Sequence, residues 1–199
     1  MQCVQGKSIL ETTPSDIRNW AGQFEGVLID LGAGDGRFVH DLAQQFSNQA
    51  FIGVDACAAN LREKSRKSPE NARFVIGDAL ILPEELRNLA TRITINFPWG
   101  SLLRGLIATD QAFIETLAEI GAHEARLDVR LNGGALSETG LTLAEGAARV
   151  VSNLQQAGIN VDTCEWLDRE QLRLVPTTWA KRLAFGRDPR AVLIAARLR

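Results

Sequence analysis

A glycine-rich turn after a short apolar run is the feature of the sequence with the clearest chemical meaning. Val27-Leu28-Ile29 leads into Asp30, and Gly32, Gly34 and Gly36 follow in the pattern G-x-G-x-G. Glycine lacks a Cβ and can take a positive φ, so such a turn brings the backbone close to a ligand. Dinucleotide enzymes use G-x-G-x-x-G to seat a pyrophosphate. The tighter spacing favours S-adenosylmethionine, which has no pyrophosphate and whose ammonium group Asp30 can complement.

Two further carboxylates follow apolar runs. Asp55 ends the run Phe51–Val54, about 20 residues beyond the turn, where a carboxylate can accept both ribose hydroxyls. Asp78 follows the next run and can accept from an adenine amino group, with Ala79 leaving room for the ring; a helix N-cap is an equal alternative for Asp78. Three acidic strand ends and the glycines together indicate a nucleotide-containing cofactor, and the glycine spacing favours methyl transfer over hydride transfer.

Two of the four tryptophans are placed to bind a base. Phe97-Pro98-Trp99-Gly100 follows an apolar run, where open α/β sheets bind ligands, and Trp179 lies on the same side of the expected sheet. Enzymes that modify a base extract it from its stack, and aromatic faces replace the lost stacking at roughly 1–3 kcal/mol per base. We therefore expect Trp99 and Trp179 to hold the substrate. Trp20 and Trp166 are expected to pack in the core.

These residues require an alternating framework of strands and helices. Apolar residues at helical spacing predict helices near 38–46, 113–120 and 143–154, the last ending at Gly158. The expected strands are Val27–Ile29, Phe51–Val54, Arg73–Ile76, Arg92–Ile95, Ala125–Leu131, Val161–Leu167 and Ala191–Ala196. The segment between the last two strands shows no convincing crossover helix, which predicts an antiparallel pair at one edge of the sheet.

The pattern predicts the Rossmann-like α/β fold of class I S-adenosylmethionine-dependent methyltransferases. In this fold a mostly parallel seven-stranded sheet has an antiparallel final strand. No linker or repeat divides the 199 residues, so we expect a single methyltransferase domain over 1–199 with a short N-terminal extension, about residues 1–25. No apolar stretch is long enough to cross a bilayer, which predicts no membrane partner.

Charge and cysteine content limit the function further. The net charge is −2, which argues against a protein that coats nucleic acid with its whole surface. The three cysteines form no CxxC pair, so we expect no metal site and a reducing cytoplasm. His40 and His123 have no partner at ligand or triad spacing, and no nucleophile and base pair is evident.

Binding to RNA would have to come from local basic clusters. A solvated surface is the alternative for either cluster. The clusters are Arg62, Lys64, Arg66 and Lys67, and Lys181, Arg182, Arg187 and Arg190.

Three segments together resemble one family. Ile29–Arg37, Phe97–Leu103 and Trp179–Arg187 are similar to the 16S rRNA (adenine-1408-N1)-methyltransferases of the Kam type, which confer resistance to kanamycin and apramycin. The glycine motif is common to many methyltransferases, whereas the combination with the other two segments is specific. The likeness extends from Gly6-Lys7 to the last expected strand.

The resemblance implies roles for particular residues. Trp99 and Trp179 would sandwich the flipped adenine, with Phe97 and Pro98 beside it, and the two basic clusters would dock a monomeric enzyme on the 30S subunit. Adenine N1 has an in-plane lone pair and needs no base, so positioning supplies most of the catalysis, and the tryptophan faces stabilise the cationic product. The residues that would line the cofactor site are Asp30, Gly32, Asp55, Ala79, Ser101 and Thr177.

Other functions remain open at this point. The stretch Arg62–Arg73 is shorter than in the family and includes Glu63 and Glu70, and Asp188 interrupts the second basic run. These departures suggest another RNA adenine or a small aromatic substrate as alternatives. Asn96-Phe97-Pro98-Trp99 also resembles the Asn-Pro-Pro-aromatic loop that holds an exocyclic amine. A cofactor-binding protein without catalysis is the third alternative.

Overall fold

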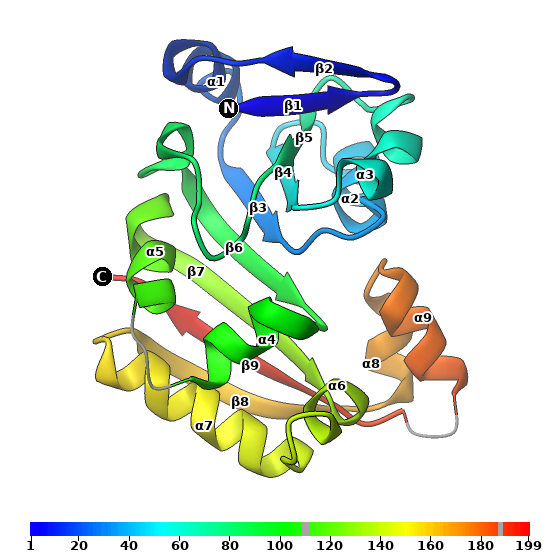
Figure 1. The fold of residues 1–199 in the computed structure, drawn as a ribbon, viewed down its shortest axis with the longest axis vertical. Helices are drawn as coiled ribbons and strands as arrows, with labels where there is room; N and C mark the ends of the chain where they lie inside the picture. Colours follow the sequence, from blue (N-terminus) through cyan, green and yellow to red (C-terminus); the bar gives the residue numbers. More distant parts are fainter. Residues whose placement is uncertain (109–111, 187–188) are drawn as a thin grey trace.

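A single mixed sheet organises the chain in the computed structural model, which describes residues 1–108, 112–186 and 189–199 (Figure 1). Within these ranges the sheet has nine strands in the order β2-β1-β5-β4-β3-β6-β7-β9-β8. The strands are β1 Gln2–Gln5, β2 Ser8–Glu11, β3 Val27–Leu31, β4 Ala50–Asp55, β5 Ala72–Ile76, β6 Ala90–Asn96, β7 Gly121–Asn132, β8 Asn160–Leu167 and β9 Ala191–Arg197.

The helices fill the connections between strands. They are α1 Pro14–Ala21, α2 Arg37–Gln45, α3 Ala58–Ser65, α4 Gly100–Ile107, α5 Ala112–Ile120, α6 Gly133–Ser137, α7 Leu143–Gln156, α8 Arg169–Leu174 and α9 Thr178–Phe185, with a short 3₁₀ turn over Glu84–Leu86. Helix α7 begins in a capping box, in which the Thr142 hydroxyl and the Glu145 carboxylate each accept from the other's backbone N–H.

Strands β5, β4, β3, β6 and β7 are parallel, and β9 runs antiparallel to both β7 and β8. The Rossmann-like fold with an antiparallel final strand is therefore confirmed, and the seven expected strands correspond to β3 to β9. The N-terminal hairpin β1-β2 extends this sheet, with Gln2 opposite Ile76 and Cys3 opposite Val75. The sequence pattern does not reveal the hairpin because its strands have four residues each and β2 is exposed throughout.

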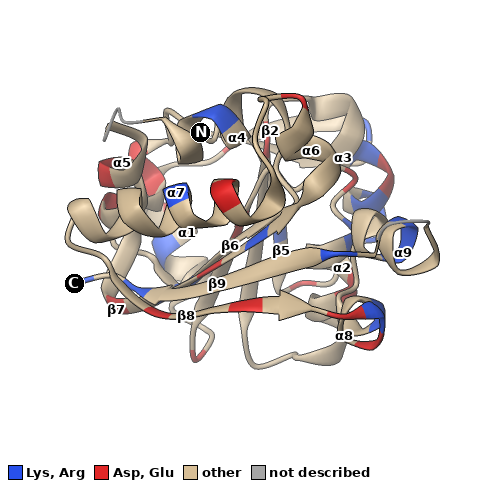
Figure 2. Ribbon diagram, turned by 90° about the horizontal axis from the view of Figure 1, so that it is seen from below, with Lys and Arg blue, Asp and Glu red and all other residues tan. Residues whose placement is uncertain are grey.

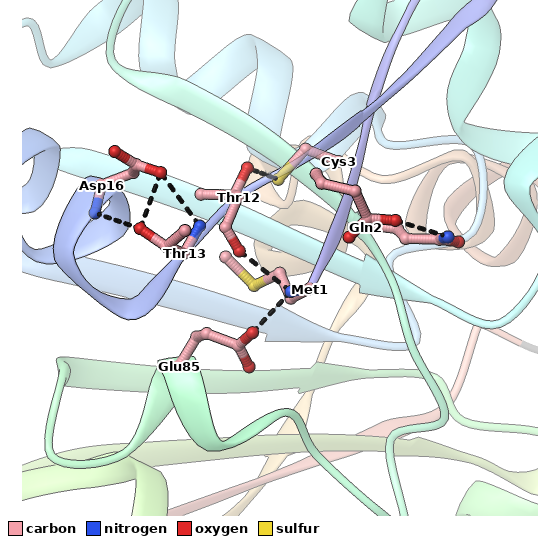
Figure 3. A network of polar contacts seen from close by, with 8 residues as sticks. Met1, Gln2, Cys3, Thr12, Thr13, Asp16 and Glu85 are labelled. Carbon is pink, nitrogen blue, oxygen red and sulfur yellow. Dashed lines mark hydrogen bonds and ion pairs between the residues drawn. The ribbon is translucent and has the colours of Figure 1, made fainter.

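The hairpin is tied to the elements that follow it (Figure 3). The Thr12 backbone N–H donates to the carbonyl of Met1 at 2.9 Å, and the Thr12 hydroxyl contacts Sγ of Cys3 at 3.4 Å. Thr13 and Asp16 form a capping box that starts α1. These contacts position the hairpin beside β5 at one edge of the sheet.

Both faces of the sheet are covered. Alternate residues of β3 enter two apolar clusters, as the period of a strand requires. On one face α1, α4, α5 and α7 pack through a cluster that includes Leu103 and Val150, and on the other α2, α3, α8 and α9 pack through a cluster that includes Phe38 and Ala180. Helices α2, α4 and α9 begin near the carboxyl ends of β3 and β6 (Figure 1).

The expected antiparallel pair at one edge of the sheet is confirmed by β8 and β9, but two features of this region differ from expectation. The segment between β8 and β9 holds the helices α8 and α9, which are too short to show a clear helical period but are capped by Asp168 and Thr177. Trp166 does not pack in the core: it is 56% exposed, because β8 is the edge strand of the sheet. Trp20 does pack against the core, and its Nε1 donates to the carbonyl of Glu70 at 3.0 Å. No helix among the described residues is long and apolar enough to cross a membrane.

Candidate functional site

A cavity of about 500 Å³ opens at the carboxyl ends of β3, β4 and β6. This is the edge of a parallel sheet at which α/β proteins bind ligands. Most of the residues that the sequence assigns to the cofactor and to the base meet here. Those lining the cavity are Asp30, Gly32, Gly34, Asp55, Asp78, Ala79, Phe97, Pro98, Trp99, Ser101, Thr177, Trp179 and Arg182.

The glycine turn forms one wall of the cavity. Gly34 has φ of 56° and its N–H donates to Oδ2 of Asp55 at 2.9 Å, which ties the turn to the end of β4. Gly36 does not line the cavity, contrary to its prediction as a cofactor contact. It precedes α2 at φ of 71°, and a Cβ there would lie 2.6 Å from the ring of Phe74. Gly36 is therefore required for packing of the turn against β5.

Asp30 is the most deeply buried acidic group at the cavity, with 2% of its surface exposed. Its Oδ1 accepts hydrogen bonds from the hydroxyl of Thr94 at 2.7 Å and from Nδ2 of Asn96 at 2.8 Å. Burial raises the pKa of Asp30 to about 7, against the effect of the two hydrogen bonds and of the nearby Arg130, which lower it. A cationic ligand group beside Asp30 would hold it in the charged form.

Asp55 ends β4, and Asp78 follows the end of β5 by two residues. Oδ1 of Asp55 accepts from the N–H of Cys57 at 2.9 Å and from the amide of Asn60 at 3.3 Å. An ionised carboxylate has about four acceptor positions, so Asp55 can still receive a ligand hydroxyl. Oδ1 of Asp78 accepts from the N–H of Leu80 at 2.9 Å within a turn, and no helix begins there, so the N-cap alternative for Asp78 is wrong.

Trp99 and Trp179 face each other across the cavity. Trp99 precedes α4 and Trp179 lies in the first turn of α9; their ring centroids are 5.2 Å apart with 29° between the planes. The guanidinium of Arg182 lies 5.3 Å from the Trp179 ring centroid. Sequence reasoning placed Arg182 in a docking cluster, but it also lines the cavity.

Phe97 holds the start of the loop that carries Trp99. Phe97 has φ of 54°, its N–H donates to the carbonyl of Arg130 at 2.8 Å, and its residue surface is 2% exposed. Its ring packs in the same apolar cluster as Phe38, so Phe97 supports the loop rather than presenting an open aromatic face to a base. Phe97 also lines the cavity, so its role as a substrate contact stays a prediction.

The two remaining cofactor candidates lie at helix starts. Ser101 is in the first turn of α4, and Thr177 caps α9 by accepting from the N–H of Ala180 at 2.8 Å. The hydroxyl of the adjacent Thr178 donates to Oδ2 of Asp35 at 2.7 Å, which joins α9 to the glycine turn. Thr178 and Asp35 are 143 positions apart in the sequence, and nothing in the pattern indicates this contact.

The basic clusters lie on α3 and α9. Arg62 and Lys64 are on α3, Arg66 and Lys67 follow it, and none of the four lines the cavity. Lys181 is exposed on α9, and Arg187 is outside the described residues. Lys and Arg segments of α3, α8 and α9 lie toward the same side of the molecule (Figure 2). In the described chain no group of three His, Cys, Asp or Glu side chains could hold a metal ion.

Comparisons with known proteins match the chain to one family. The model of the family NpmA, 16S rRNA (adenine(1408)-N(1))-methyltransferase, matches residues 2–198. Proteins of the same description from Escherichia coli and Streptoalloteichus hindustanus are 32% and 29% identical to this chain, and each alignment covers 94% of both proteins.

Solved structures give the same result. An antibiotic-related methyltransferase is 31% identical with a TM-score of 0.87, covering 98% of this chain and 100% of the other. The aminoglycoside resistance methyltransferase NpmB1 is 28% identical with a TM-score of 0.83, covering 100% and 99%. The 16S rRNA methyltransferase KamB, at 23% identity and a TM-score of 0.90, supports the fold. The resemblance carried by the three sequence segments is confirmed, and the chain belongs to the NpmA family of 16S rRNA (adenine(1408)-N(1))-methyltransferases.

Proposed function

We propose that the chain transfers the methyl group of S-adenosylmethionine to N1 of adenine 1408 of 16S rRNA in the 30S subunit, and thereby confers resistance to aminoglycosides. The observation that carries the proposal is the presence of two facing tryptophans in the cavity that also holds the buried Asp30 and the glycine turn. One wall suits a cofactor with a cationic end, and the opposite wall suits a flat aromatic acceptor.

The donor set of the cavity fits S-adenosylmethionine. Asp30 is placed to pair with the ammonium group, Asp55 to accept from the ribose diol, and Asp78 with Ala79 to receive the adenine. When bound, the cofactor supplies an electrophilic methyl group on a sulfonium. The chain's own task is to hold the acceptor in line with that group, which is worth several kcal/mol because it removes the entropic cost of encounter.

A base must separate the tryptophan rings to enter. Two stacking gaps of about 3.5–4 Å each require roughly 7–8 Å between the rings, more than the 5.2 Å between the Trp99 and Trp179 centroids. Trp179 is 38% exposed on a short helix, whereas Trp99 packs against the core, so Trp179 is the ring that moves. After transfer the adenine is cationic, and the two indole faces stabilise it by cation–π attraction.

The rRNA would dock across α8 and α9. Residues 169–185 carry four basic side chains and one acidic one in a chain of net charge −2. Phe185 and Leu174 are 76% and 83% exposed on the same two helices, and the guanidinium of Arg173 lies 5.4 Å from the Phe185 ring centroid. Cations beside exposed aromatic surface are what unpaired RNA bases bind. The basic residues at α3 would extend this contact.

Primer extension on small subunits tests the proposal. Purified 30S subunits are treated with the protein and labelled S-adenosylmethionine, and a stop at adenine 1408 with incorporated label is expected, because N1-methylation blocks base pairing. Labelled subunits without that stop would point to another position or to the exocyclic amine, and unlabelled subunits would sink the proposal.

We also expect a monomer to suffice, since all the proposed contacts come from one chain, and we expect action in the cytoplasm, where ribosomes are found.

A further inference from the structure

One amide side chain connects the two walls of the cavity. Asn96 is the last residue of β6 and leads directly into the loop that carries Trp99. Its Nδ2 donates to Oδ1 of Asp30 at 2.8 Å, and its Oδ1 accepts from a guanidinium nitrogen of Arg130 at 3.0 Å. Asn96 and Asp30 both line the cavity.

The neighbours of Asn96 fix which way its amide points. A guanidinium can only donate and an ionised carboxylate can only accept, so the oxygen must face Arg130 and the nitrogen must face Asp30. Arg130 lies opposite Asn96 in the register of β7 and β6, and the two strands hold the pair together. One partner at each end of the amide thus fixes its orientation.

Asp30 depends on these hydrogen bonds for its charge. At 2% exposure, burial disfavours the carboxylate form, and hydrogen bonds donated to that form favour it. Both side-chain hydrogen bonds, from Thr94 and from Asn96, fall on Oδ1, and Oδ2 remains for a ligand. The pKa of Asp30 is about 7 with both bonds in place, and both bonds lower it, so the loss of either shifts the group toward its protonated form. A neutral carboxyl cannot pair with an ammonium.

We propose that Asn96 is a positioning residue of the cofactor site: its amide, oriented by Arg130, keeps the Asp30 carboxylate charged and aimed at the ammonium group of S-adenosylmethionine. The identity of the cofactor rests on the proposed function. Asn96 contacts no reacting atom in this scheme; it acts through Asp30. Asn96 also leads into the loop that carries Trp99. The same residue therefore connects the proposed cofactor site at Asp30 to the proposed base site at Trp99.

Several other charged groups surround Asp30. The Asp55 carboxylate on β4 opposes its ionisation, and Arg130 on β7 favours it. Other charged side chains on the elements around it are Asp35 in the glycine turn, Asp78 after β5, Arg92 on β6, Arg126 and Asp128 on β7, and Arg182 on α9. Apart from Arg130, which loses its hydrogen bond to Asn96 in the variants, these groups keep their covalent structure and surroundings when wild type and variants are compared.

Calorimetric binding at several pH values tests the proposal, with two probes that differ in one feature. S-adenosylhomocysteine carries the ammonium group, and 5′-methylthioadenosine lacks the whole amino acid part. In Asn96→Leu, loss of a hydrogen bond to a charged group should weaken S-adenosylhomocysteine about tenfold at pH 6.5 and less than about twofold at pH 8.5, where Asp30 is ionised in both proteins. Binding of 5′-methylthioadenosine should be unchanged at every pH.

Two further variants make the result specific. Asn96→Ala removes the amide without adding bulk and should give the same pH pattern, so a failure of Asn96→Leu to fold does not end the test. Asn48→Leu is the matched control, because the exposed Asn48 also donates to a carboxylate, Glu25, at 2.7 Å, but outside the cavity. It should bind both probes like the wild type.

The outcomes separate the inference from the proposed function. Equal weakening of both probes, or a loss of S-adenosylhomocysteine binding that is constant with pH, means a general distortion and overturns the role of Asn96. Unchanged binding of both probes overturns it as well. A wild type that methylates no rRNA but shows the expected pH pattern would refute the proposed substrate and leave the role of Asn96 intact.

Discussion

The indole rings of Trp99 and Trp179 stack on each other, with centroids 5.2 Å apart, although Trp99 precedes α4 and Trp179 lies on α9, far away in the chain. Each ring covers the face that the proposed base would occupy. The stack removes apolar surface of both rings from water. In the proposed reaction the base enters between the two rings and stacks on both.

Removing either ring should abolish most of the methylation without removing cofactor binding. Trp99→Ala and Trp179→Ala each delete one stacking face, worth roughly 1–3 kcal/mol, so single-turnover methylation of 30S subunits should fall by about 5- to 150-fold. Trp99→Phe and Trp179→Phe keep a face and should retain more activity. Binding of S-adenosylhomocysteine measures the cofactor site separately. Full activity in both alanine variants would contradict this role of the two rings.

The basic side chains of α9 should account for part of the salt dependence of RNA binding. Lys181→Ala and Arg182→Ala each remove one potential phosphate contact, and each should reduce the slope of log affinity for 30S subunits against log salt by roughly one or less. Arg66→Ala tests the cluster near α3 in the same way. Arg149→Ala, on the exposed side of α7, is the control and should leave the slope unchanged. Identical slopes for all the variants would mean that RNA docks elsewhere.

The parts of this molecule that the sequence predicts are those with a local signal. The glycine turn, the acidic residues at strand ends and Phe97-Pro98-Trp99 each follow an apolar run, and the rule that parallel strands end at one edge is enough to bring them together. The hydrogen bonds of Asn96 to Asp30 and of Thr178 to Asp35 have no such signal, because they join segments 66 and 143 positions apart. They appear only once the strand register is known.

Burial of side chains explains the other differences between the expected and the observed positions of residues. Gly36 belongs to the same motif as Gly34, and only the position of the Phe74 ring shows that one is needed for packing while the other faces the cavity. Trp166 is exposed although it is expected in the core, whereas Phe97 at the cavity is almost fully buried. The sequence pattern around a buried aromatic residue at a strand end does not differ from that around an exposed one on an edge strand. The helices that pack on that part of the sheet determine which of the two is buried.

Gly36→Ala and Gly34→Ala should therefore fail in different ways. In Gly36→Ala an alanine must adopt a left-handed backbone conformation, and its Cβ clashes with the buried Phe74. We therefore expect a loss of roughly 2–4 kcal/mol in the free energy of unfolding, measured with urea. A Cβ at Gly34 meets no atom within 4 Å, so only strain, about 1–2 kcal/mol, is expected there. In Gly34→Ala the loss in the free energy of S-adenosylhomocysteine binding should exceed the loss in the free energy of unfolding. Equal stability of both variants would contradict the packing role of Gly36.

Asp30 should make the ligand-free protein less stable as the pH rises. The folded-state pKa of about 7 is above the ordinary value of 3.8, so the folded protein holds this proton more tightly than the unfolded chain does. The resulting stabilisation is complete below about pH 4 and is lost as the pH rises through 7. Asp30→Asn cannot lose a proton, and its Oδ1 can still accept from Thr94 and Asn96. The variant should match the wild type near pH 4 and exceed it by roughly 2–4 kcal/mol at pH 8.

The same substitution should remove the pairing with the cofactor ammonium. Asp30→Asn should therefore bind S-adenosylhomocysteine at least about tenfold more weakly at pH 8, while 5′-methylthioadenosine binds as before. Urea unfolding at pH 4 to 8, with and without S-adenosylhomocysteine, measures both effects on one protein. If the variant is no more stable than the wild type at pH 8, the burial of Asp30 costs nothing and its carboxylate needs no help from Asn96. If it is more stable but binds normally, then the ammonium is held elsewhere. A gain in stability together with a loss of binding is the result expected of a buried charge that is retained for its ligand.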